Sequence, residues 1–138
     1  MNLVERATWL ICCSLALQSA CGESQTGPTS PPALTVTAIA PSGGPVGTTV
    51  TIEGSGFSPT GNVVKFGVGY LSDLTSPDGR ALLFAVPEGH NMCPPTELGY
   101  MEPCAGGVYP KVQPGNYAVS VVTRTETSRQ VLFTVTER

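Results

Sequence analysis

Side chains that could do acid–base or metal chemistry are few in this chain. Its one histidine, His90, lies between Gly89 and Asn91 in a stretch that predicts a loop. A Ser–His or Cys–His catalytic pair would need this imidazole, and no further ligand stands beside it at zinc spacing. We therefore expect a solvated His90, with a metal ligand or a general base as the alternatives. We expect no metal and no cofactor.

The acidic residues do not form a catalytic pair in the sequence. No two of them stand two residues apart on one predicted strand, where their carboxyl groups would share a face. Glu97 and Glu102 lie in a long irregular stretch, residues 88–114, and a weak Ca²⁺ site between them is an alternative. A hydrolase would need a pocket that holds His90 and an acid, so the sequence predicts that the chain is not an enzyme.

Three tyrosines are the candidates for contact with a partner. Tyr100 and Tyr109 lie in the irregular stretch, and Tyr70 lies near a predicted sheet edge. An aromatic ring offers an apolar face and, in tyrosine, a polar tip, which suits contact with a sugar or a peptide. A sugar-binding platform would need these rings exposed and coplanar. Packing within the loop is the alternative role.

The N-terminal segment has the pattern of an export signal. An uncharged, mostly apolar run covers residues 7–17, which is too short for the roughly 20 residues of a membrane-spanning helix and suits the apolar core of a signal peptide. Residues 1–20 are therefore predicted to be a signal peptide. The one tryptophan, Trp9, would leave with it.

The end of this signal, Ser19-Ala20-Cys21, resembles that of bacterial lipoproteins, although Gln18 stands where an aliphatic or small residue is usual. The resemblance implies a lipid on Cys21 and attachment to a membrane of the bacterial cell envelope, on the periplasmic side or at the cell surface. Ordinary secretion with cleavage near Ala20 is the alternative.

The five cysteines can all be accounted for on this interpretation. Cys12 and Cys13 leave with the signal, and Cys21 takes the lipid. Cys93 and Cys104 remain as an even pair in an oxidising compartment. They are predicted to form a disulfide that closes a loop of 12 residues, counting the two cysteines.

Beyond Cys21 the composition changes twice. Residues 21–33 hold Gly, Ser, Thr and Pro with no large apolar side chain, which predicts a flexible tether. From Leu34 onward, short segments appear in which apolar and polar residues alternate with a period of two, which indicates strands. The domain is therefore predicted to cover residues 34–138, with strands over 36–40, 49–53, 62–67, 69–73, 80–86, 115–123 and 130–136.

About seven short strands without a convincing helix predict an all-β sandwich of two sheets. The inward side chains are expected to be alternate residues such as Val50 and Ile52, Val64 and Phe66, or Leu82 and Phe84. Two glycines around Ser55 predict a bulge in that strand. The long stretch from Glu88 to Pro114 shows no periodicity, and a loop of that length is usually functional or pinned.

Four segments resemble the IPT/TIG family of immunoglobulin-like domains (immunoglobulin-like, plexins, transcription factors). They are Ile39 to Phe57, with its sequence IAPSGGPVGTTVTIEGSGF; Val64-Lys65-Phe66-Gly67; Leu82 to Pro87; and Pro114-Gly115-Asn116-Tyr117-Ala118-Val119-Ser120-Val121. The resemblance implies an immunoglobulin-like β-sandwich. The family's members include ectodomain repeats, bacterial surface proteins, domains attached to polysaccharide enzymes and dimerisation domains of transcription factors. Such a fold specifies no chemistry by itself.

The expected function is that of an anchored or secreted binding or scaffold module in the envelope, acting on a protein or glycan partner. The alternative is a carbohydrate-binding module that assists polysaccharide recognition. Nucleic acid is not expected as a partner, because the net charge is −3 and no run of Lys and Arg is present. We expect a monomer.

Overall fold

The computed structural model describes residues 27, 30–99 and 109–138. By its contacts the chain divides into two units, Met1–Ser30 and Pro31–Arg138. The predicted signal peptide, Cys21, Tyr100, Glu102 and Cys104 lie outside the described residues, so the lipid, the disulfide and the Ca²⁺ alternative stay predictions. Among the residues that are described, no helix has the length and apolar character that crossing a membrane requires.

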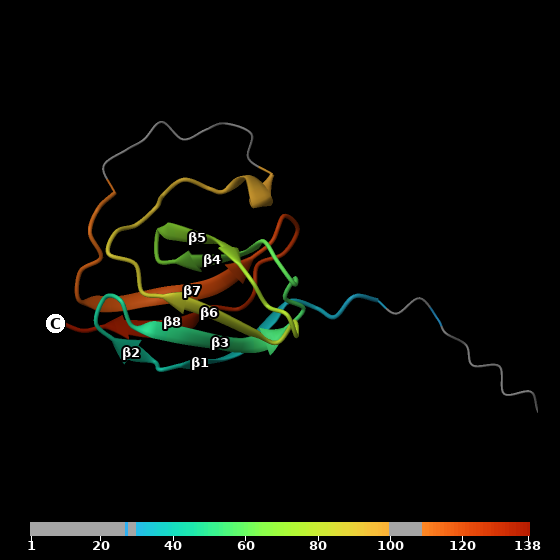
Figure 1. Ribbon diagram of the computed structural model, residues 1–138, viewed down its shortest axis with the longest axis horizontal. Coiled ribbons are helices and arrows are strands. Elements are labelled where there is room, and N and C mark those ends of the chain that lie inside the picture. Colours follow the sequence, from blue (N-terminus) through green and yellow to red (C-terminus); the bar gives the residue numbers. More distant parts are fainter. Residues whose placement is uncertain (1–26, 28–29, 100–108) are drawn as a thin grey trace, which may run out of the picture. The chain divides into compact units, whose positions relative to one another are not determined.

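Two sheets make up the domain, as the alternation predicts (Figure 1). The first has three strands in the order β1 (Thr35–Ala40), β3 (Thr49–Ser55) and β6 (Ala81–Ala85). The second has five, in the order β2 (Gly43–Gly44), β8 (Val131–Val135), β7 (Gly115–Val122), β4 (Asn62–Phe66) and β5 (Gly69–Leu74). The immunoglobulin-like sandwich is thus confirmed.

The described residues contain eight strands, against the predicted count of about seven. The additional strand is β2, which pairs in parallel with the end of β8 through Gly43 opposite Thr134. It covers two glycines between Pro41 and Pro45, so no alternation of side chains marks it in the sequence. Through β2 the chain passes from the edge of the first sheet to the edge of the second.

The core lies between the sheets and uses the alternate residues that the pattern selects. Val50 and Ile52 of β3 and Phe66 of β4 are fully buried. They pack with further buried residues from both sheets, among them Val64, Leu82, Phe84, Val119, Val121 and Phe133. Each such side chain contributes about 1.5–3 kcal/mol by leaving water.

The predicted bulge lies on the neighbouring strand instead. β3 continues through Gly54 to Ser55, and the register shift falls in β1 between Val36 and Ala38. Gly54 is needed for a different reason: a Cβ there would lie 2.0 Å from the Thr35 carbonyl oxygen and 2.6 Å from the Phe57 ring. Its missing side chain lets Phe57 fold back into the core, where the sequence places it.

The described ends of the 88–114 stretch are fixed to the sandwich by backbone hydrogen bonds. Gly89 forms an antiparallel bridge with Lys111, and the N–H of Val112 donates to the Glu88 carbonyl at 2.9 Å. Farther along, the N–H of Tyr70 in β5 donates to the Asn91 carbonyl at 2.7 Å. Val112 itself joins the core. The described ends of this stretch are therefore part of the domain.

The expectation of a solvated His90 is wrong. The imidazole is 6% exposed and lies beside the rings of Phe66 and Tyr117, with centroids 6.4 Å and 5.4 Å away. Its Nδ1 has no hydrogen-bond partner among the described residues. Gly69 makes room for it, since a Cβ at that position would lie 3.1 Å from this nitrogen. His90 thus extends the aromatic part of the core.

Candidate functional site

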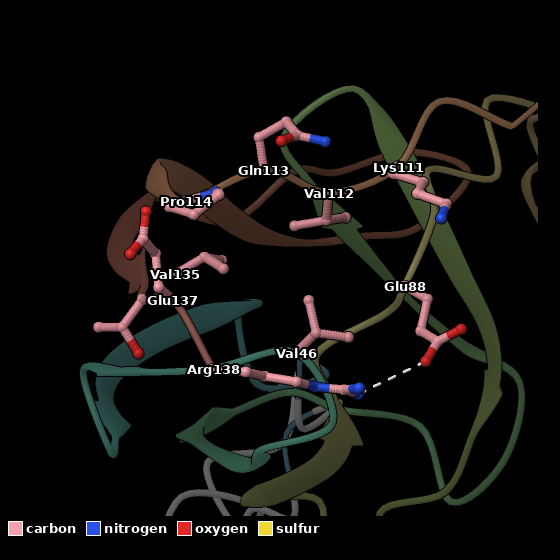
Figure 2. Close-up of a pocket in the computed structure, with 10 residues that line it drawn as sticks. Val46, Glu88, Lys111, Val112, Gln113, Pro114, Val135, Glu137 and Arg138 are labelled. Atoms are coloured by element: carbon pink, nitrogen blue, oxygen red, sulfur yellow. Dashed lines mark hydrogen bonds and ion pairs between the residues drawn. The ribbon is translucent and has the colours of Figure 1, made fainter.

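One hollow, which we call the end hollow, lies where β8 finishes and β7 begins (Figure 2). It has a volume of about 340 Å³. Figure 2 shows Val46, Val112 and Val135 pointing toward one another to form an apolar floor. The remaining lining residues surround that floor and are mostly polar: Glu88, Lys111, Gln113, Pro114, Thr136, Glu137 and Arg138.

Charges of both signs stand on the rim of the end hollow. Arg138 reaches across to Glu88, with Nη2 and Oε1 3.5 Å apart, and both side chains are exposed. Lys111 and Glu137 supply one further charge of each sign. Because an exposed ion pair contributes only about 0–1 kcal/mol, a ligand can replace it at little cost. The end hollow can accept an apolar group flanked by mixed charges.

The wall of the end hollow is held by Tyr117. Its hydroxyl donates to the Gln113 carbonyl at 2.8 Å and accepts the Gln113 N–H at 3.0 Å. Its ring stacks on Phe66 with the centroids 4.9 Å apart. A tyrosine that bonds back to the backbone a few residues upstream is a recurring device of immunoglobulin-like sandwiches. It positions residues 113 and 114 at the rim.

A second hollow, which we call the sheet hollow, lies on the outer face of the five-stranded sheet and has a volume of about 250 Å³. Lys65 of β4 pairs with Tyr70 of β5 on one side and with Ser120 of β7 on the other, so the three share a face. Leu98 of the short helix η1 (Thr96–Leu98) stands beside them. The other lining residues are Val122, Thr123, Arg124, Thr127 and Gln130.

The structure separates the tyrosines that the sequence proposes as partner contacts. Tyr70 lines the sheet hollow, where the Lys65 ammonium lies 5.9 Å from its ring centroid. Tyr109 is 49% exposed and packs beside Gly89, away from both linings. Tyr100 lies outside the described residues. The described rings of Tyr70 and Tyr109 make no contact with each other. A coplanar platform that includes Tyr100 stays a prediction.

Two carboxyl groups that the sequence leaves apart meet in the structure. Asp73 hydrogen-bonds Glu97, and this bond together with the negative charge of Glu97 raises the pKa of Asp73 above its ordinary value. Glu97 lines a third hollow of about 270 Å³, which shares Leu98, Thr123 and Arg124 with the sheet hollow. Among the described residues, no group of three His, Cys, Asp or Glu side chains could hold a metal ion.

The candidate sites contain residues that sequence reasoning missed. Ser120 and Val63 both point to the outer face of their sheet, yet they are 2% and 1% exposed. Over β4, the strand of Val63, packs η1, which is fixed by Arg124, whose Nε donates to the Glu97 carbonyl at 2.9 Å. Leu98 of η1 lines the same hollow as Ser120. A period of two identifies the face of a strand but not what covers that face, so no signal in the sequence marks Ser120.

Comparison with known proteins identifies a family. A model of the IPT/TIG domain covers residues 34–102, which include β1 to β6 and η1. The matched residues end before β7 and β8, although both strands belong to the same five-stranded sheet. No curated protein matches the sequence.

Proposed function

The chain belongs to the IPT/TIG domain family, and on that premise we propose that it is an anchored, non-catalytic binding module of the bacterial cell envelope. The family is one of immunoglobulin-like binding or scaffold modules. The anchor in this proposal is a lipid on Cys21, and residues 21–33 are the tether between membrane and domain. The partner is a protein that places an apolar side chain on the valine floor of the end hollow and meets charges of both signs on its rim.

The observation that carries the proposal is the position of the end hollow relative to the point where the chain enters the sandwich. Arg129, which precedes β8, donates to the carbonyls of Val36 and Thr37 near the start of β1. The end hollow forms around Val135, the last residue of β8. Figure 1 shows the chain entering the sandwich at one end of β8, while the other end of β8 leads to the C-terminus. The end hollow, which Val135 lines, therefore lies at the end of β8 away from the chain entry. A tether attached at residue 34 leaves the end hollow open to a partner.

The position of His90 supports binding rather than hydrolysis. The only histidine of the chain packs against Phe66 and Tyr117 and lines neither the end hollow nor the sheet hollow. A base that must take a proton from a substrate needs to lie within hydrogen-bond reach of it. Cys93 and Cys104 have a structural role in this proposal, as the disulfide that closes the loop between them.

The anchor is tested by the mass and location of the protein. Protein extracted from the membranes of the producing bacterium should carry a lipid on Cys21, and the Cys21→Ser variant should move to the soluble fraction. An unlipidated mature form of the wild-type chain in the soluble fraction would contradict the anchor. It would leave the end hollow untouched as a binding site.

The binding end is tested with a photo-crosslinking amino acid placed in the full chain in cells. At Gln113, on the rim of the end hollow, it should give a discrete adduct with one protein. At Thr37, at the opposite end of the sandwich, the same group should give none. Adducts of equal yield from both positions, or from neither, would refute the end hollow as the partner site.

A further inference from the structure

The sheet hollow is built on strands, and its polar side chains form one row. Tyr70, Lys65 and Ser120 are cross-strand neighbours on β5, β4 and β7. Gln130, next to the first residue of β8, lines the same hollow. Backbone pairing fixes the spacing of these groups, so a ligand would meet them without first ordering a loop.

The charges in the sheet hollow are of one sign. Lys65 and Arg124 line it, and none of its lining residues is acidic. The sole ion pair within the described residues joins Arg138 to Glu88, so neither of these two cations is neutralised by one. Arg124 gives its Nε to the Glu97 carbonyl. In a chain of net charge −3, this concentration of unpaired positive charge favours an anionic group.

The hydroxyl of Ser120 opens into the same hollow. Ser120 is 2% exposed, and its side chain forms no hydrogen bond with any described residue, unlike the buried Ser128, whose Oγ accepts the Val121 N–H and donates to the Arg129 carbonyl. Among the described residues, the only buried side-chain nitrogen or oxygen atom without a partner is His90 Nδ1, so the Ser120 oxygen is reached by solvent through the hollow. A hydroxyl that lines a cavity and has no protein partner is suited to bond a ligand there.

We propose that the sheet hollow binds one acidic sugar residue of a polysaccharide, with the sugar's carboxylate at Lys65 and its hydroxyl groups at Ser120 and Gln130. The Tyr70 ring supplies an apolar surface for the C–H groups of the pyranose. The volume of about 250 Å³ is below the roughly 300–1,000 Å³ of pockets that enclose a drug-sized ligand. The hollow therefore takes one sugar unit while the rest of the polymer runs over the surface.

The Glu97 carboxylate lies outside the lining of the sheet hollow. Glu97 lines the adjoining hollow instead, where its carboxylate accepts the Thr96 hydroxyl at 3.5 Å. It contributes only its backbone carbonyl to Arg124. The site is independent of the end hollow and of any lipid on Cys21, so it can fail or stand without them.

The test is calorimetric titration of the purified full chain with a trisaccharide of galacturonic acid. The matched ligand is the same trisaccharide with its carboxyl groups reduced to alcohols. We expect the acidic trisaccharide to bind and the neutral one to bind at least about tenfold more weakly. The reason is that a hydrogen bond to a charged group contributes about 1.5–3 kcal/mol. Lys65→Gln should weaken the acidic ligand by a similar factor of about ten, and Ser120→Ala by about threefold.

The control variant is Lys111→Gln, which removes the same charge at the end hollow and should change the affinity by less than about twofold. Thermal unfolding of each variant shows that a loss of binding is not a loss of folding. Equal affinity for the acidic and the neutral trisaccharide, or equal effects of Lys65→Gln and Lys111→Gln, would overturn the proposal. So would tighter binding of a tri-glutamate peptide, which would assign the hollow to acidic protein segments.

Discussion

The end hollow and the sheet hollow are of similar size but differ in what lies beneath them. Val112 and Val135, on the floor of the end hollow, belong to the hydrophobic core, and the rim carries cations and anions together. Lys65 and Ser120 of the sheet hollow stand on the outer face of a sheet, with no acid among the lining residues. The first hollow is an opening in the core, and the second is assembled outside it.

This difference determines what a substitution should change. A residue on the floor of the end hollow contributes to folding, so its loss lowers stability whatever it binds. A residue of the sheet hollow is already outside the core, so its loss should affect a ligand and leave folding nearly unchanged. Charges that are balanced locally do not select a ligand by sign, whereas an unbalanced pair of cations does.

The largest expected effect is on the floor of the end hollow. Val135→Ala should lower the free energy of unfolding by about 2 kcal/mol, because a residue that is 3% exposed loses two buried methyl groups. Urea denaturation measures this loss. The control is Leu132→Ala on the same strand, 65% exposed, which should change stability by no more than about 0.5 kcal/mol. Equal losses from both would show that the floor is not part of the core.

Two buried serines, Ser128 and Ser120, should differ in their effect on stability. Ser128→Ala should cost about 1.5 kcal/mol of unfolding free energy, because it leaves the Val121 N–H without the acceptor that lies 2.9 Å away. Ser120→Ala should stay within about 0.5 kcal/mol, since its hydroxyl bonds no described residue. Denaturation under identical conditions measures both. A Ser120→Ala loss as large as that of Ser128→Ala would mean that its hydroxyl supports the fold rather than a ligand.

The wall of the end hollow should respond to removal of a single oxygen. Tyr117→Phe keeps the stack on Phe66 and removes both hydrogen bonds to Gln113. We expect a loss of about 1 kcal/mol of unfolding free energy and faster amide hydrogen exchange at Gln113. The sheet hollow serves as the internal control, because exchange at Ser120 should not change. Equal acceleration at both amides would mean that Tyr117 stabilises the whole sheet.

The smallest effect concerns the carboxyl pair beside the sheet hollow. The hydrogen bond to Glu97, and then the charge of Glu97, raises the pKa of Asp73. The protonated form of Asp73 therefore stabilises the fold. This stabilisation is complete below the ordinary pKa of an aspartic acid and is lost as pH rises through the raised pKa of Asp73. Asp73→Asn removes that loss, and asparagine tolerates the φ of 57° at this position. The variant should therefore be more stable than the wild type near about pH 7 and equal to it near about pH 3, as measured by thermal unfolding. A difference that does not change with pH would refute the pair.

Much of the fold could be predicted because strands leave a period of two. Alternation at Val50 and Ile52, or at Leu82 and Phe84, correctly identifies the inward faces. β2 could not be found in this way, since two glycines have no side chains to alternate. The bulge was assigned to the strand with glycines, whereas the close approach of Phe57 explains Gly54 and the extra residue lies in β1.

The candidate sites were harder to predict because they depend on segments without periodicity. The position of His90 in a predicted loop, beside Gly89 and Asn91, indicates a solvated side chain. The Gly89–Lys111 bridge instead brings its ring over Phe66. Tyr70 is expected near a sheet edge, and it lies on the edge strand β5, where it lines a hollow; its contact with a partner stays a prediction. In the sequence, Ser120 has the pattern of an ordinary outward residue, because Leu98, which lines the same hollow, is distant from it along the chain.

The guanidinium of Arg129 has a consequence for how molecules of this protein meet one another. β1 is an edge strand, and such edges offer unpaired backbone groups on which a second chain can extend the sheet. Arg129 binds two adjacent carbonyls of that edge, at Val36 and Thr37, next to the irregular register at Ala38. An incoming strand must displace the Arg129 guanidinium and match an irregular hydrogen-bonding register. These two features therefore oppose polymerisation of the domains through this edge.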